Sequence, residues 1–205
     1  MIAGLNFIVA GFGDKAVSAY GIGFRIDSFA ILPILGLSGG LVPLLGYFRG
    51  AKNYVGARKA NRIALRMSII FGVLIGIAVY LIAPYVGGIF TNDATVISIT
   101  AAYLQIMAFA YVFMGIGITV SASFQGMGRG MPSLVITMIR AVVLVIPLSY
   151  ILSEFMGVGG VALGIVIASI VSSLASFLWI EHYFKSICAK CYAKEEKESQ
   201  VASAQ

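Results

Sequence analysis

Long apolar runs, separated by short polar or basic turns, occupy almost the whole chain. Most of these runs are apolar around the full circumference of a helix and exceed the roughly 20 residues that a helix needs to cross a bilayer. The pattern therefore predicts an all-α polytopic membrane protein with about five complete transmembrane helices. They are expected at about residues 16–48, 63–90, 94–124, 133–153 and 161–184.

The two ends of the chain differ from these runs. Residues 1–11 are apolar but reach only about 17 Å as a helix, and they lack the basic flank of a signal peptide. We therefore expect a truncated first helix there, so that residues 1–184 form one helical lobe in the bilayer. Residues 185–205 are rich in Lys, Glu and Ser. A disordered cytosolic tail is expected, because such a segment can bury little apolar surface.

The longest run, residues 16–53, holds two charges and a proline between its ends. Arg25 and Asp27 are two positions apart, so they point about 200° apart around a helix and need separate partners. Pro33 removes a backbone hydrogen bond and predicts a kink in the middle of this helix.

Composition and charge support a membrane location. The 205 residues are 60% hydrophobic and 11% charged, whereas soluble domains carry about 25% charged residues. Most Lys and Arg lie in alternate turns, at 49–66, at 129 and from 185 onward. The positive-inside rule places these segments in the cytosol, with residues 50–66 at the lipid headgroups. Nucleic acid is not an expected partner, because the basic residues are not clustered with aromatic ones.

Asp27 is the one acid that this interpretation places inside the membrane. An ionised carboxylate there costs several kcal/mol unless it is paired, so it is a candidate for handling a cation or a substrate. The alternatives are an ion pair with Arg140 or another base, or a position facing a wet cavity. Arg25 and Arg140 repel cations, so structural roles are expected for both, as partners across helices or as side chains that reach the headgroups.

Four large side chains lie on one broad face of the run at 94–124, namely Tyr103, Met107, Tyr111 and Met114. Aromatic rings and thioethers bind flat organic cations through cation–π and dispersion contacts. This face is therefore a candidate substrate surface. The alternative is ordinary packing, which is the usual role of such a stripe.

Catalytic and metal chemistry are not expected. His182 is the single histidine and lies at a membrane edge, far from any nucleophile that could complete a Ser/His/Asp set. Cys188 and Cys191 form a Cys-x-x-Cys pair, but a structural zinc site needs four ligands. Reduced thiols or membrane-proximal acylation are the expected states of this pair. The glycine-rich segment 125–130 follows no strand and lacks the Lys-Ser/Thr of a phosphate loop, so it is expected to be a turn.

A set of short motifs recurs in a fixed order along the chain. They are Ala19-Tyr20-Gly21, Arg25, Pro33, Gly36, the segment from Gly46 to Asn53, the loop from Gln125 to Arg129, Arg140, Pro147-Leu148-Ser149-Tyr150, Gly157 and Gly160-Val161.

In order and spacing, these motifs resemble the carboxy-terminal half of the multidrug and toxic compound extrusion (MATE) family. The resemblance covers nearly the whole chain. It implies one six-helix lobe of a two-lobe antiporter that exports small organic cations or drugs across a prokaryotic cytoplasmic membrane in exchange for Na⁺ or H⁺. The expected partners are the lipid bilayer, a missing amino-terminal lobe and the cation substrate, with no cofactor apart from the coupling ion.

In some members of the family, coupling carboxylates lie in the seventh and tenth helices. Here the corresponding run, 94–124, contains no acid, and the first segment offers only Asn6 as a polar candidate for the ion pathway. The resemblance by itself therefore assigns a coupling carboxylate to the missing lobe, whereas the chemistry of the residues keeps Asp27 as a candidate in this one. Two other functions stay open, a flippase for lipid-linked saccharides and a non-transporting membrane scaffold. Several Arg or Lys in the cavity would favour the flippase.

Overall fold

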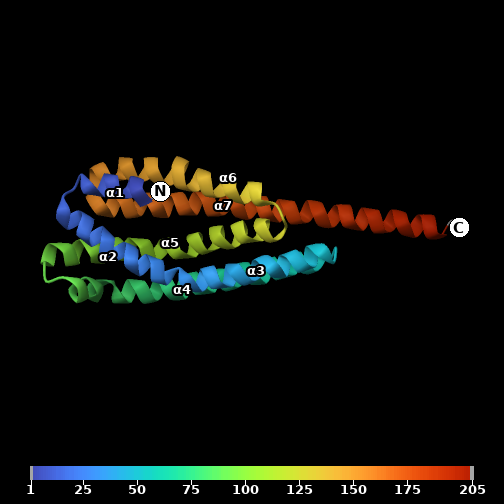
Figure 1. Cartoon of the computed structure of the whole chain (residues 1–205), viewed down its shortest axis with the longest axis horizontal. Coiled ribbons are helices and arrows are strands. Elements are labelled where there is room, and N and C mark those ends of the chain that lie inside the picture. The colour runs from blue at the N-terminus through green and yellow to red at the C-terminus, as the bar shows by residue number, and fades with distance from the viewer. Residues whose placement is uncertain (1, 204–205) are drawn as a thin grey trace.

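Helices account for nearly all of the described chain, and most of them run along one common axis (Figure 1). The computed structural model describes the backbone of residues 2–203 and the side chains of residues 4–187 and 189. The predicted all-α class is confirmed, since no strand occurs within residues 2–203. The elements are α1 (Ile2–Ala10), α2 (Asp14–Ala30), α3 (Leu32–Gly50), α4 (Tyr54–Phe90), α5 (Ala94–Gly126), α6 (Gly130–Met138), the π-helix η1 (Ile139–Val145) and α7 (Ile146–Ser203).

Within the described residues, four stretches are long and apolar enough to cross a membrane: Leu32–Gly50, Tyr54–Phe90, Ala94–Gly126 and Gly130–Ile187. The last stretch turns back on itself at Gly157, where φ is 59° and ψ is −134°. A side chain would strain this left-handed conformation, so glycine is suited to the reversal. The two arms on either side of Gly157 run antiparallel (Figure 1).

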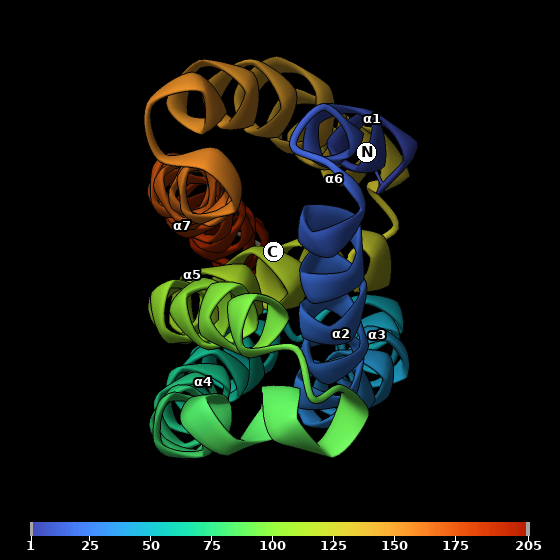
Figure 2. The same ribbon diagram turned by 90° about the vertical axis from the view of Figure 1, so that its left-hand side faces the viewer.

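The run that was predicted as one helix at 16–48 is divided into α2 and α3 at Ile31. Pro33 lies in the first turn of α3, where its missing N–H costs no helical hydrogen bond. The break therefore falls just before the proline, and not at it. Figure 2 shows the result: α2 crosses from the side of α1 and α6 to the side of α4 and α5.

The structure continues α7 as a helix to Ser203, where the sequence predicted a disordered tail from residue 185. The last segment is rich in Ala, Lys, Glu and Gln, which are strong helix formers. It also follows directly from a packed helix, so no new nucleation step is needed. Low apolar content removes tertiary packing but does not by itself end a helix.

The basic turns lie at one end of the bundle, which we call the basic end: the α3–α4 turn, the α5–α6 turn and the exit of α7 (Figure 1). At the opposite end, Lys15 Nζ lies 2.7 Å from Asp93 Oδ2. Asp93 also caps α5 by accepting a hydrogen bond from the Thr95 N–H at 2.9 Å. The hydrogen bond from Lys15 is the largest of several effects that lower the pKa of Asp93.

Two apolar cores hold the helices together, one toward each end. The core toward the opposite end contains Tyr103, Met107 and Tyr111 of α5. The core toward the basic end contains Phe124 of α5 and Phe184 of α7. α4, α5 and α7 contribute to both cores, and α5 packs against α2, α3, α4, α6 and α7. It is therefore the central helix of the bundle, and it positions the groups described next.

Candidate ion and substrate site

Asp27 of α2 is held by two tyrosines of α5. The Tyr103 hydroxyl donates to Asp27 Oδ2 at 2.8 Å, and the Tyr111 hydroxyl donates to Oδ1 at 2.5 Å. Both tyrosines are 1% exposed, whereas Asp27 is partly exposed. The carboxylate therefore sits between a buried aromatic wall and the protein surface, with one hydrogen bond on each oxygen.

Gly23, one helical turn before Asp27, allows this arrangement. A Cβ atom at Gly23 would lie 2.5 Å from Cδ1 of the Tyr103 ring, closer than real Cβ atoms come to any neighbour. The Tyr103 ring thus lies directly against the backbone of α2. Tyr20, on the same helix, packs edge-on against Tyr103 with ring centroids 5.6 Å apart, and it stacks with Phe24 at 6.4 Å. Aromatic side chains of α2 and α5 therefore lie together on the buried side of the carboxylate.

The arrangement leaves the carboxylate with spare binding capacity. A carboxylate can accept about four hydrogen bonds, and the described residues supply two to Asp27, both from neutral phenols. Neutral donors stabilise the negative charge without cancelling it. A proton or a metal cation such as Na⁺ could use the remaining lone pairs.

The other predicted candidates lie in different surroundings. Met107 is buried in the same core as Tyr103, and Met114 is partly buried against that core. Asn6 is exposed on α1. The structure thus brings Asp27, Tyr103 and Tyr111 into direct contact and places the two methionines in the packing behind them.

Asp27 and Arg140 form no ion pair within the described side chains, so that alternative is wrong; the hydrogen bonds of Asp27 come from the two tyrosines instead. Within the described side chains, neither Arg25 nor Arg140 forms an ion pair, so the expected pairing across helices is absent there. Arg25 is exposed and faces a depression near Lys15 at the opposite end. Arg140 is partly buried in η1.

A second polar group lies toward the basic end, around a cavity of about 540 Å³ between α3, α5, α6, η1 and α7. Gln125 Nε2 donates to Ser133 Oγ at 3.0 Å, and the Ser121 and Ser133 hydroxyls are in hydrogen-bond contact. The sequence interpretation missed this group because it treated Gln125 as part of a turn. The available signal was the i, i+4 spacing of Ser121 and Gln125 in an otherwise apolar helix.

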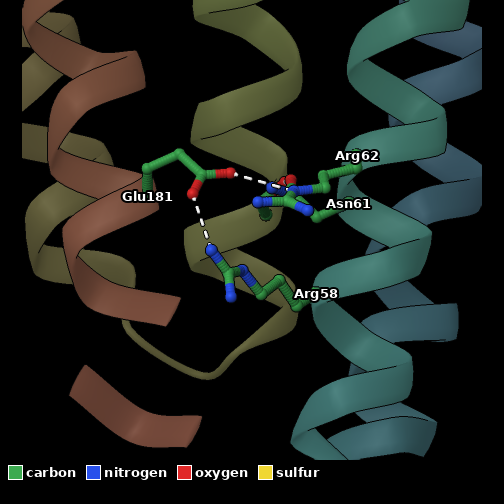
Figure 3. A network of polar contacts seen from close by, with 5 residues as sticks. Arg58, Asn61, Arg62 and Glu181 are labelled. Carbon is green, nitrogen blue, oxygen red and sulfur yellow. Dashed lines mark hydrogen bonds and ion pairs between the residues drawn. The ribbon is translucent and has the colours of Figure 1, made fainter. Parts of the chain in front are cut away.

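Residues 50–66 were expected to lie at the headgroups, but two of the arginines there bind an acid of α7 (Figure 3). Arg58 Nη2 lies 3.0 Å from Glu181 Oε2, and Arg62 Nε lies 3.3 Å from Glu181 Oε1. Between them, the buried Asn61 accepts a hydrogen bond from the Ser123 hydroxyl at 2.6 Å. The basic end of α4 is thereby fastened to both α5 and α7.

Within the described residues, no group of three or more His, Cys, Asp and Glu could hold a metal ion. His182 is exposed. Cys188 and Cys191 lie outside the described side chains, so their expected states stay predictions.

Comparison with known proteins agrees with the fold. The sequence profile of the MatE family matches residues 3–151. The multidrug export protein MepA of Staphylococcus saprophyticus is 31% identical over 178 residues, which cover 85% of this chain and 38% of that protein. A MepA of Staphylococcus aureus is 32% identical over 176 residues, with the same coverage of both chains, 85% and 38%.

Solved structures give the same picture. An outward-facing multidrug resistance MATE family transporter of the MOP superfamily superposes with a TM-score of 0.87 at 26% identity, over 92% of this chain and 43% of that chain. The Vibrio cholerae MATE transporter VcmN in its bent form gives a TM-score of 0.83 at 26% identity, over 88% and 41% of the two chains. The chain spans about two fifths of the length of the relatives it matches. It therefore belongs to the MatE family of membrane transporters, which are not enzymes, and corresponds to one lobe of such a transporter.

Proposed function

We propose that this chain forms one lobe of a secondary active antiporter that exports organic cations or drugs in exchange for Na⁺ or H⁺, with Asp27 as the residue that binds the exchanged cations. The observation that carries this proposal is the contact of Asp27 with the hydroxyls of Tyr103 and Tyr111.

The charge of Asp27 supports a cation site. Removing a carboxylate from water costs several kcal/mol, which an opposite charge normally offsets. Within the described side chains, Asp27 forms no ion pair, and its hydrogen bonds come from neutral hydroxyls. A bound cation would supply the missing positive charge. Competition between a coupling ion and an organic cation for one carboxylate is a direct way to exchange them.

The aromatic surroundings favour an organic cation as the transported molecule. Tyr20 is in ring contact with both Phe24 and Tyr103, and Tyr103 donates to the carboxylate. The faces of aromatic rings attract cations by about 0.5–2 kcal/mol each, and they bind flat molecules without a fixed hydrogen-bond pattern. The MepA relatives are named multidrug export proteins, which agrees with a site of this kind.

The assembly that we propose contains a second lobe. Relatives are more than twice as long as the matched region, so a complete transporter would pair this lobe with an amino-terminal one across a central cavity. The basic end, including the exit of α7, would face the cytosol of a prokaryotic cell according to the positive-inside rule.

Ethidium transport in proteoliposomes tests the proposal. The chain alone is expected not to move ethidium when a Na⁺ or H⁺ gradient is applied, whereas the chain coexpressed with the amino-terminal lobe of a relative is expected to do so. In that complex, Asp27→Asn should lower coupled transport at least about tenfold, because a neutral amide cannot balance a cation. Asp93→Asn, a matched change at the opposite end, should keep transport.

Two results would overturn the proposal. Unchanged transport by Asp27→Asn would remove the role of this carboxylate, and transport by the isolated chain would refute the two-lobe assembly. A flippase for lipid-linked saccharides is less well supported, because among the described residues Arg140 is the single charged one lining the cavity toward the basic end. If the complex inserts normally but moves no cation, the scaffold function is favoured.

A further inference from the structure

The cavity of about 540 Å³ toward the basic end has a charge pattern that the cation site does not explain. Among the side chains that the structure describes, its lining contains one charged group, Arg140, and no acid. The other polar side chains around it are hydroxyls and one amide, from Ser38, Ser121, Gln125, Thr137 and Ser172.

Arg140 projects into this cavity without a counter-charge. Within the described side chains it forms no ion pair and no hydrogen bond. Its Nη1 atom lies near α5 at Gly117, where an added Cβ would be 3.5 Å away. Arg140 is the second residue of η1, and π-helical segments are rare and occur frequently at functional sites.

Ser38 of α3 provides an independent sign of a missing ligand. Its hydroxyl is buried, it has no hydrogen-bond partner among the described residues, and it lines the same cavity as Arg140. A buried polar group left without a partner costs about 1–3 kcal/mol. Ser38 and Arg140 line the same cavity, so an acceptor bound there is the kind of partner that both groups lack.

We propose that this cavity binds a single anionic group, a carboxylate or a phosphate, with the guanidinium of Arg140 as its main partner and the hydroxyl of Ser38 as a second donor. The guanidinium can hold such a group through two parallel hydrogen bonds. The source is either a free anion or the headgroup of an anionic lipid. This inference does not rest on the role of Asp27, because Gly117 is six positions, or about 9 Å, along α5 from Tyr111.

Thermal unfolding of the chain in nanodiscs tests the site. In phosphatidylcholine nanodiscs, benzoate or inorganic phosphate should raise the unfolding temperature in a saturable way. Arg140→Gln should weaken the apparent affinity about 10- to 100-fold, the range for losing hydrogen bonds to a charged partner. Arg66→Gln removes an exposed charge outside the cavity and should leave the affinity unchanged.

Two further variants keep the test valid if Arg140→Gln does not fold. Arg140→Lys retains the charge but lacks the planar fork, and Ser38→Ala removes the second donor, so each should give an intermediate loss of affinity.

A second set of nanodiscs, in which phosphatidylglycerol replaces part of the phosphatidylcholine, identifies the source of the anion. If only that lipid stabilises the chain, and Arg140→Gln abolishes the effect, the anion is a lipid headgroup. Absence of stabilisation in both sets of nanodiscs, or equal stabilisation of Arg140→Gln, would overturn the proposal.

Discussion

The contact between Asp27 and its two tyrosines leads to a quantitative prediction for stability. Tyr103→Phe and Tyr111→Phe each remove one hydroxyl that donates to the carboxylate and leave the ring in place. Hydrogen bonds to charged groups contribute about 1.5–3 kcal/mol, compared with about 0.5–1.5 kcal/mol for neutral pairs. Each change should therefore lower the free energy of unfolding by about 1.5–3 kcal/mol.

A double-mutant cycle separates the carboxylate from other neighbours of the ring. In an Asp27→Asn background the hydrogen bond is between neutral groups, so Tyr103→Phe should cost about 1 kcal/mol less there than in the original chain. The measurement is reversible unfolding by dodecyl sulfate in mixed micelles, followed by circular dichroism. Tyr80→Phe is a suitable control, because Tyr80 is exposed on α4 and has no hydrogen bond in the described part of the chain.

Two results of this cycle would contradict a hydrogen bond between the Tyr103 hydroxyl and the Asp27 carboxylate. If Tyr103→Phe costs the same in both backgrounds, the carboxylate is not the partner of the hydroxyl in the membrane protein. If Tyr80→Phe costs as much as Tyr103→Phe, the loss reflects a general effect of removing hydroxyls. Either result would also remove the main support for a cation site at Asp27.

Three shorter predictions concern other contacts. Gly23→Ala should displace the Tyr103 ring and lower the free energy of unfolding by about 1–3 kcal/mol, and equal stability would show that the ring can move without cost. Glu181→Gln should cost about 1–2 kcal/mol, because it leaves two arginines of α4 facing each other without a counter-charge, and high salt should reduce this loss. The lowered pKa of Asp93 implies that its pairing with Lys15 stabilises the fold above about pH 4 and loses this effect as the pH falls through the lowered pKa. Asp93→Asn should then make stability less dependent on pH below about 4, and an unchanged acid profile would contradict the pairing.

The sequence predicted the long helices and the candidate carboxylate for simple physical reasons. An apolar run that is longer than the bilayer is thick forms a transmembrane helix in most cases. A single acid within such a run is a candidate functional residue, because an ionised group is costly there. The partners of Asp27 could not be predicted in the same way. Tyr103 and Tyr111 are 76 and 84 positions away, and their approach depends on how α2 crosses α5. The absence of a side chain at Gly23 permits that crossing but does not identify it.

The contacts at the basic end could not be predicted from the sequence either. Arg58 and Arg62 belong to a stretch whose charge suits lipid headgroups, and the sequence offered no reason to prefer Glu181, which is 123 and 119 positions away. The π-helical segment around Arg140 has no local signature such as a glycine or a proline within Ile139–Val145. Pro147, two positions after the segment, has no N–H to donate to the Val143 carbonyl within it, so a local contribution comes from just outside the segment.

The opposite charges of Asp27 and Arg140 raise the question of whether they neutralise each other. Their contacts on α5, at Tyr111 and Gly117, are about 9 Å apart along the helix axis. At roughly 10 Å and an effective dielectric constant of about 20, their attraction is roughly 1.7 kcal/mol. The cost of removing each ion from water is several kcal/mol, so this attraction does not compensate either charge. Each group therefore needs its own partner. In our two proposals, a cation at the tyrosine-bound carboxylate and an anionic group at the arginine would supply these partners, on one wall of the same lobe.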